Sequence, residues 1–344
     1  MLPAQNLSTP ETVLKYMRET RAAAQASPHP VNKVAATVFG RDHSGHFWQS
    51  QHTNYWPSVI EEKLGRDRAI GSASGTVHSE TAAILSASHP TDGASICVTD
   101  PCCPNCAKNI VEAGIRHVYL DADGFEKDFY KRRAGAFNTL TLDVFRRAGV
   151  LVSQVDTHTG LLKPLIGRDD ILQENKPAQI IVQSLRGWKH IPSLTETFKN
   201  NKVEMPQGIY ARTVLLNPDR KTPLLVTAYR DHPDTAYGST PQHSGNQYSP
   251  DIEPIDILLM WKARMGYTFG SSSIMTSHIP TCRELVHVIG SGIQSLVISD
   301  MSHSIDPKGA EAILLLTTHR MLNISRLQNP TYPKAGVVDP QSHP

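Results

Sequence analysis

The sequence lacks the features that mark membrane, secreted and strongly charged proteins. No apolar run approaches the ~18 residues that a membrane span needs, and the N-terminus has no basic start followed by an apolar stretch, so a secretory signal is not expected. The chain has 34 Lys and Arg against 32 Asp and Glu, and this net charge of +2 does not favour an electrostatically bound nucleic acid. We therefore expect a cytoplasmic globular protein with no membrane partner.

Cysteine is scarce, and its distribution is informative. Three of the five cysteines are Cys102, Cys103 and Cys106, while Cys97 lies close by and Cys282 stands alone. An odd number gathered in one segment does not suit a disulfide framework, and a chain this long buries about three quarters of its unfolded surface without one. The cluster therefore points to metal binding or catalysis.

The chain contains an internal repeat. Residues 95–121 (SICVTDPCCPNCAKNIVEAGIRHVYLD) align without a gap with residues 273–299 (SIMTSHIPTCRELVHVIGSGIQSLVIS). Each segment predicts a short apolar strand, a turn, an amphipathic helix ending at Gly and a second strand. Upstream, residues 33–42 resemble residues 209–219, and both predict the first strand of a hairpin. The repeat predicts two tandem copies of one domain.

Each half is predicted to run helix, hairpin, helix, strand, helix, strand, helix, which is an α/β/α layer arrangement. The leading helix is expected over residues 11–24, with Thr9 as N-cap and Pro10 at its first position. Further helices are expected over residues 135–147 and 307–321. The predicted domains are a catalytic unit over residues 1–156, a connector over 157–206, a degenerate copy over 207–328 and a loose tail over 329–344.

The first half carries a set of residues suited to a catalytic zinc site. His78 and Glu80 stand at a predicted helix start, and Cys103 and Cys106 form a C-x-x-C pair at the next one. Two thiolates and one imidazole suit a tetrahedral Zn²⁺ and leave the fourth position for water. A helix N-terminus favours thiolates, and Glu80 stands where it can move protons without binding the metal. A structural zinc knuckle and a redox C-x-x-C are the alternatives.

The H-x-E and P-C-x-x-C pair is typical of zinc nucleobase deaminases. From the leading helix to about residue 156, the chain resembles the cytidine/deoxycytidylate deaminase superfamily, most closely its deoxycytidylate deaminase branch. The stretches HSETAAIL and PCCPNCAKNIVEAGIRHVYLD carry the resemblance. It implies a three-layer α/β/α cytidine-deaminase-like fold, which the repeat predicts in two tandem copies.

The resemblance also implies roles for individual residues. His78, Cys103 and Cys106 would bind Zn²⁺, and Glu80 would be the proton shuttle for attack on C4 of a cytosine ring. The branch uses an Asn at the end of its hairpin on the substrate's sugar, which makes Asn54 a substrate-binding candidate.

The sequence departs from the family pattern at two places. Cys102 stands where Pro usually precedes the first thiolate, and HSE replaces the commoner HAE. We expect Cys102 to be a bystander and not a ligand.

A cationic segment follows the second strand of the first half. Lys131, Arg132 and Arg133 are candidates for binding a substrate phosphate, because Arg binds phosphate in a bidentate manner. The alternative is a solvated helix face, since residues 121–150 hold six basic and five acidic side chains.

The second half lacks the predicted zinc ligands. The positions that match Asn54, His78, Glu80, Cys103 and Cys106 are Arg230, Asp251, Glu253, Thr281 and Glu284. We therefore expect a catalytically dead copy that packs against the active one as an internal pseudo-dimer. Homo-oligomerisation is left open.

The predicted function is zinc-dependent hydrolytic deamination of a small-molecule cytosine nucleotide, with dCMP to dUMP favoured. One alternative is deamination of a base in tRNA or single-stranded nucleic acid, which the near-neutral charge does not favour. Another is a non-catalytic, zinc-stabilised binding or regulatory module. A deaminase fused to a nicotinamide-binding reductase is disfavoured, because the second half repeats the first.

Overall fold

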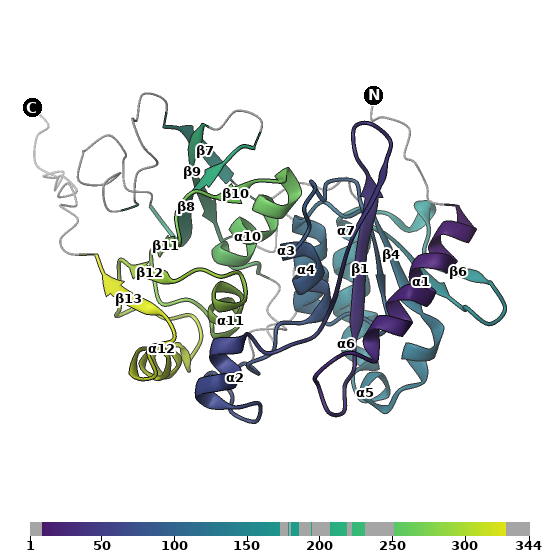
Figure 1. Ribbon diagram of the computed structural model, residues 1–344, viewed down its shortest axis with the longest axis horizontal. Helices are drawn as coiled ribbons and strands as arrows, with labels where there is room; N and C mark the ends of the chain where they lie inside the picture. The colour runs from purple at the N-terminus through teal and green to yellow at the C-terminus, as the bar shows by residue number, and fades with distance from the viewer. Residues whose placement is uncertain are drawn as a thin grey trace, which may run out of the picture.

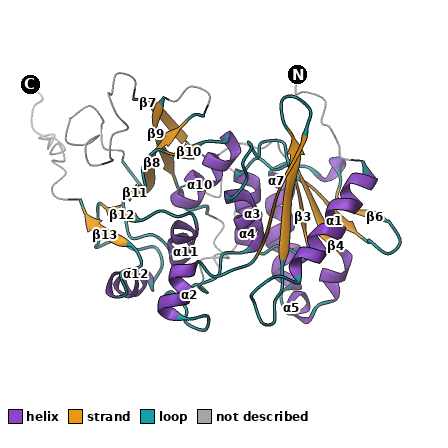
Figure 2. Ribbon diagram, in the orientation of Figure 1, coloured by secondary structure: helices purple, strands orange, loops and turns teal. Residues whose placement is uncertain are grey.

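The computed structural model describes residues 9–172, 178, 180–185, 194, 207–218, 222–230 and 251–327. They form two mixed β-sheets, one in each half of the chain, with helices lying between the two sheets (Figure 1, Figure 2). Every helix among the described residues is too short or too polar to cross a membrane.

The first sheet has the strand order β2-β1-β3-β4-β5-β6. β1 pairs antiparallel with β2 and β3, the strands β3, β4 and β5 run parallel, and β6 returns antiparallel. The strands are β1 (Ala35–Arg41), β2 (Phe47–Thr53), β3 (Ser95–Val98), β4 (His117–Asp121), β5 (Leu151–Val155) and β6 (Leu162–Ile166). The helices are α1 (Pro10–Ala24), α2 (Ser58–Leu64), α3 (Ser79–Leu85), α4 (Pro104–Glu112), α5 (Asp128–Lys131), α6 (Ala134–Ala136) and α7 (Leu142–Arg147), with single turns at Ala122–Glu126, Phe137–Thr141 and Arg168–Asp170.

The second sheet repeats this order. Its path is β13-β12-β11-β8-β9-β7, with β10 pairing β8, so β9-β8-β11-β12-β13 corresponds to β2-β1-β3-β4-β5 in both order and strand direction. β7 adds a strand beyond β9. The strands are β7 (Ile180–Ser184), β8 (Tyr210–Leu216), β9 (Pro223–Tyr229), β10 (Thr268–Phe269), β11 (Ser273–Thr276), β12 (Ser295–Ile298) and β13 (Asn323–Arg326), and the helices are α10 (Pro254–Met265), α11 (Cys282–Gly290) and α12 (Gly309–Thr318).

Helices cover both faces of the first sheet. α1 packs on one face, where the ring of Tyr16 stacks on Phe39 with centroids 4.2 Å apart. α3 and α4 cover the other face and contact α10 of the second half. The buried apolar residues on that side form one cluster that runs from Ile96 and Ile110 to Leu258 and Val286. The two halves therefore share a continuous hydrophobic core.

Much of the predicted local structure is confirmed. α1 begins as expected, because the Thr9 hydroxyl accepts a hydrogen bond from the amide of Thr12 at 3.3 Å and Pro10 fills the first helical position. α4 ends before Gly114, whose φ of +76° suits only glycine without strain. The predicted α/β cytidine-deaminase-like layer arrangement is thus confirmed for the chain.

Some predictions are refined by the structure or are left open. Residues 135–147 are helical as predicted, and this helix contains a π-helical segment at Phe137–Thr141 between α6 and α7. The predicted connector, residues 157–206, contains β6 and β7, each added to the edge of a sheet. The predicted tail, residues 329–344, lies outside the described residues. The shared strand order is what a duplication gives, but the duplication and the domain bounds remain predictions.

Candidate functional site

Three ligand side chains come together at the N-termini of α3 and α4. His78 is the N-cap of α3, Cys103 is the N-cap of α4, and Cys106 lies in the first turn of α4. His78 Nδ1 is 3.3 Å from Cys106 Sγ and 3.6 Å from Cys103 Sγ, and one ligand atom of each residue lies within 4.8 Å of the others. A tetrahedral zinc with ordinary bond lengths holds nitrogen and sulfur about 3.6 Å apart. The donor set therefore fits Zn²⁺ with one position left over.

The local backbone explains how these thiols are presented. Cys103 has an extended conformation, its Sγ accepts a hydrogen bond from the amide of Cys106 at 3.5 Å, and Pro104 opens the helix. The Cys106 side chain and the neighbouring His78 hold the pKa of Cys103 well below its usual range. Cys103 is therefore poised as a thiolate, which is the form that binds a metal.

Glu80 stands beside these ligands in the first turn of α3. It is 5 % exposed, and its Oε2 accepts a hydrogen bond from the Ser79 hydroxyl at 3.1 Å. Burial raises the pKa of Glu80, whereas the electrostatic interaction with the nearby His78 lowers it. A buried carboxyl group next to a metal position is suited to accept and return a proton.

Cys102 is buried, and it is outside the metal-ligand cluster that the described residues form. Burial raises the pKa of its thiol well above the usual value, and the adjacent Glu80 carboxylate raises it further. The expected bystander is therefore a neutral thiol packed beside Glu80.

A cavity of about 590 Å³ opens over the ligand cluster. Ligand cavities for small molecules have this order of size. Its wall brings together several predicted site residues, which are Asn54, His78, Glu80, Cys103 and Arg133. Cys106 is almost fully buried and does not line the cavity.

The three predicted phosphate-binding cations are not brought together. Arg133 lines the cavity, with its guanidinium over the ring of Phe129 at 4.4 Å. Arg132 lines a neighbouring cavity of about 640 Å³, and Lys131 Nζ is 3.6 Å from a carboxylate oxygen of Glu126. Of the three predicted phosphate-binding cations, Arg133 alone lines the cavity that contains the ligand cluster. Consecutive residues of a helical turn point in different directions, which separates it from Lys131 and Arg132.

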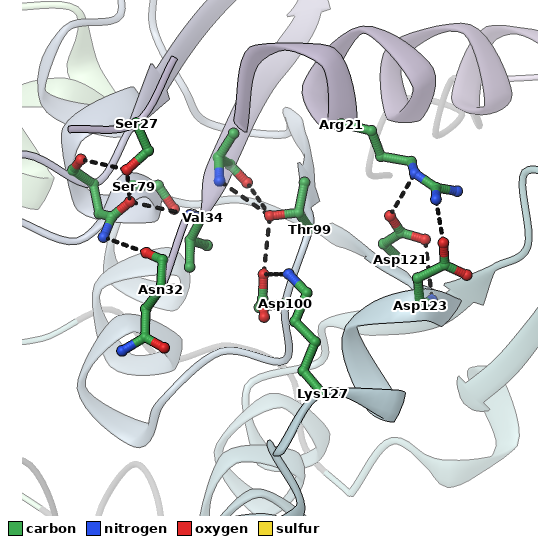
Figure 3. Close-up of polar contacts among 12 residues, drawn as sticks. Arg21, Ser27, Asn32, Val34, Ser79, Thr99, Asp100, Asp121, Asp123 and Lys127 are labelled. Carbon is green, nitrogen blue, oxygen red and sulfur yellow. Dashed lines mark hydrogen bonds and ion pairs between the residues drawn. The ribbon is translucent and has the colours of Figure 1, made fainter. Parts of the chain in front are cut away.

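Other cations on the wall were missed by the sequence reasoning. Arg66 and Arg68 come from the loop after α2, and Arg283 comes from α11 of the second half. The RDR run at residues 66–68 was a visible signal, but no local pattern connects Arg283 with the other residues of the cavity wall, which are at least 150 residues away in the sequence. Lys127, at the start of the cationic segment, donates to Asp100 at 2.7 Å (Figure 3).

Asn54 lies on the cavity wall, but its side chain is also hydrogen-bonded to neighbouring segments of the chain. Its Oδ1 accepts hydrogen bonds from the Ser27 hydroxyl at 2.7 Å and the Val34 amide at 3.1 Å. Its Nδ2 donates to the backbone oxygen of Asn32 at 2.9 Å, so one N–H of the amide group is left for a ligand.

Asn54→Ala is expected to lower the free energy of unfolding by about 1–3 kcal/mol, because it leaves buried donors and an acceptor without partners. Urea denaturation of the full chain measures this change. Asn32→Ala is the matched control, since Asn54 bonds to the backbone of Asn32 and not to its side chain. Equal stability of the two variants would contradict the structural role of Asn54.

The second half shows how its equivalent site is filled. Thr281 and Glu284 occupy in α11 the positions that Cys103 and Cys106 have in α4, as the alignment predicted. The predicted match of Asp251 with His78 is shifted, because Glu253 is the N-cap of α10 and thus stands where His78 does. Arg230 follows β9 as Asn54 follows β2, and it pairs with Glu253 at 2.9 Å.

One family model matches the N-terminal part of the chain. Residues 10–122 match the model described as the cytidine and deoxycytidylate deaminase zinc-binding region. This stretch contains Asn54, His78, Glu80, Cys103 and Cys106.

Two curated proteins show similarity to parts of the chain. It is 42 % identical over 84 residues to ComE operon protein 2 of Bacillus subtilis (strain 168), and 34 % identical over 100 residues to an "Uncharacterized deaminase in luxG 3'region" of Aliivibrio fischeri. The matches cover 24 % and 29 % of this chain, and 39 % and 66 % of the respective relatives. The chain thus spans less than two thirds of the length of these relatives.

Two solved structures of a dCMP deaminase from the cyanophage S-TIM5 also match, one in apo form and one in complex with dCMP and dUMP. The identities are 23 % and 22 %, covering 42 % and 43 % of this chain and 98 % and 100 % of the matched chains. Both TM-scores are 0.28.

Proposed function

Residues 10–122 carry the zinc-binding region of the cytidine and deoxycytidylate deaminase superfamily, and on that premise we propose that the chain is a zinc-dependent hydrolytic deaminase. Its proposed substrate is a free cytosine nucleotide, with dCMP converted to dUMP and ammonia released. The proposed ligands of Zn²⁺ are His78, Cys103 and Cys106, and the proposed proton shuttle is Glu80.

The observation that carries the proposal is the joint placement of these four residues. The ligand atoms fit a tetrahedral metal with one position for water, and the buried Glu80 stands two residues from His78 at the cavity wall. A structural zinc knuckle uses four protein ligands, whereas three ligands beside a cavity are typical of a catalytic site.

The chain's own residues support the chemistry as follows. Bound Zn²⁺ would make a water acidic enough to lose a proton near neutral pH and so to act as the nucleophile on a ring carbon. Glu80 is placed to take a proton from that water and to pass protons to the ring and to the departing amino group. In the net reaction one water is consumed, the C4–N bond breaks, an oxygen replaces the amino group and ammonia leaves.

The charge of the cavity wall supports a nucleotide over a nucleoside. Arg66, Arg68 and Arg133 lie on the same wall as Asn54, and a substrate phosphate needs cations of this kind. Arg66 also pairs with Glu61 at 2.5 Å. The choice of dCMP among cytosine nucleotides rests on the family resemblance.

Ammonia release from the zinc-loaded full chain tests the proposal across cytosine and adenine bases, nucleosides, nucleotides, short RNAs and tRNA. We expect turnover of a free cytosine nucleotide, with dCMP preferred and cytidine at least tenfold slower in kcat/KM, because one lost charged contact costs about this factor. Turnover confined to tRNA or short RNA would replace the free nucleotide by a nucleic acid. Bound zinc without turnover of any substrate would favour the non-catalytic binding module.

A further inference from the structure

We propose that Arg283, which belongs to the degenerate second half, is a positioning residue for the deaminase site of the first half. It would act by fixing the cavity-wall segment that runs from Ser74 to Thr76 and leads directly into His78. This inference rests on the proposed function for its kinetic consequence.

The contacts of Arg283 cross from one half to the other. Its Nη1 donates to the backbone oxygen of Thr76 at 2.7 Å, and its Nη2 donates to the Ser74 hydroxyl at 3.2 Å. The residue lies in the first turn of α11 and is 8 % exposed, yet it lines the same cavity as Glu80 and Cys103. A fork of two donors holds a segment in one orientation better than a single contact does.

The segment ahead of Thr76 also depends on the second half. At Gly71, whose φ is +57°, an added Cβ would lie 2.4 Å from the Sγ of Cys282 and 2.9 Å from the backbone oxygen of Lys308. The next residue, Ser72, donates its hydroxyl to Asp306 at 2.6 Å. Gly71, Ser72, Ser74 and Thr76 thus all lie against residues of the second half.

The segment after Thr76 connects this contact to the chemistry. Val77 forms a bridge with Tyr55, the neighbour of Asn54, through backbone hydrogen bonds of 2.8 and 3.1 Å. The Tyr55 hydroxyl in turn donates to the backbone oxygen of Gly290, at the end of α11. His78 and Glu80 follow Val77 directly, so a shift of the segment would move a ligand and the proton shuttle together.

Arg283 also lies within electrostatic reach of the ligand pair. Burial lowers the pKa of its guanidinium, while its interaction with Cys103 and Cys106 raises it. α10 and α11 lie on the side of the second half that faces α3 and α4 (Figure 1). The second half, without a ligand set of its own, would therefore still influence the site of the first half.

Arg264 provides a matched control at the same junction of the two halves. It pairs with Asp92 of the first half at 2.9 Å, but it lies outside the cavity wall described above. Arg264→Met removes a cross-half ion pair without touching residues 74–78, so it reports on a purely structural contribution.

The experiment compares zinc-loaded full-length Arg283→Met, Arg283→Lys and Arg264→Met with the wild type. It measures kcat and KM for dCMP, together with hydrogen–deuterium exchange of peptides that cover residues 70–80. Arg283→Met is expected to exchange faster in these peptides and to lose about 10- to 100-fold in kcat, because small misplacements of catalytic groups cost this much. Arg283→Lys should recover part of both effects, and Arg264→Met should stay within twofold of the wild type.

Unchanged kcat and exchange in Arg283→Met would overturn the proposal, and so would an equal loss in Arg264→Met, which would indicate a general effect of the junction. If the wild type turned over no substrate, the proposed function would fail, whereas the exchange measurement would still show whether Arg283 fixes the segment.

Discussion

Glu80→Gln is expected to abolish turnover while the protein keeps its zinc. The amide has nearly the shape of the carboxylate, but it cannot accept a proton from water or return one to the leaving amino group. General acid–base catalysis by one side chain contributes about 10²- to 10⁴-fold, so kcat should fall by about three orders of magnitude or more. Ammonia release gives the rate, and metal analysis of the same sample gives the zinc content.

Ser79→Ala is the matched control for this variant. The Ser79 hydroxyl donates to Glu80 Oε2 at 3.1 Å, so its removal perturbs the position of the carboxylate and leaves the proton acceptor present. We expect a loss of less than tenfold, in line with one hydrogen bond. A Glu80→Gln protein that stays active to within tenfold would remove the shuttle role, and loss of zinc from it would show that Glu80 supports the metal site.

The residues of the candidate centre were predictable because their signal is local. His78 and Glu80 are two apart, Cys103 and Cys106 are three apart, and each pair stands at a helix start that its own sequence specifies. Helix N-termini present side chains and free amides in a fixed geometry, so a short motif is enough to define half of the site. The repeat then predicted the order of the second sheet.

The rest of the site depends on contacts between distant segments. Arg283 and Thr76 are separated by more than 200 residues, and they meet because the two halves pack together, with α10 against α3 and α4. Asn54 was predicted as a substrate contact, but its bonds to Ser27, Asn32 and Val34 follow from the path of a loop that no pattern specifies. The π-helical segment at Phe137–Thr141 likewise has no signature within a helix that the sequence predicts correctly.

In the second half a carboxyl group joins two helix N-termini. Glu284 Oε1 accepts a hydrogen bond from the amide of Ile255 at 2.9 Å, and its Oε2 accepts from the amide of Thr281 at 2.8 Å. One carboxyl group thus joins the N-termini of α10 and α11, as His78 and the two cysteines would join α3 and α4 through a metal. The group is fully buried, and burial raises its pKa well above the usual value.

The purified chain is therefore expected to bind about one zinc, and His78→Ala or Cys103→Ser should lose it together with all measurable turnover. Each variant leaves two protein ligands where three are needed, and a catalytic zinc site does not tolerate that loss. Metal analysis after dialysis against a mild chelator measures the content of each protein.

Cys97→Ala separates the loss of a ligand from the loss of a thiol. Cys97 is buried under α1 with Tyr16 and Phe39, in a cluster on the far face of the sheet from α3 and α4. This variant should lose some stability and retain its zinc. Full zinc content in Cys103→Ser would contradict the ligand assignment. Two zinc ions per chain would mean that the second half also binds metal, and the carboxyl group of Glu284 would then have to release both helix N-termini.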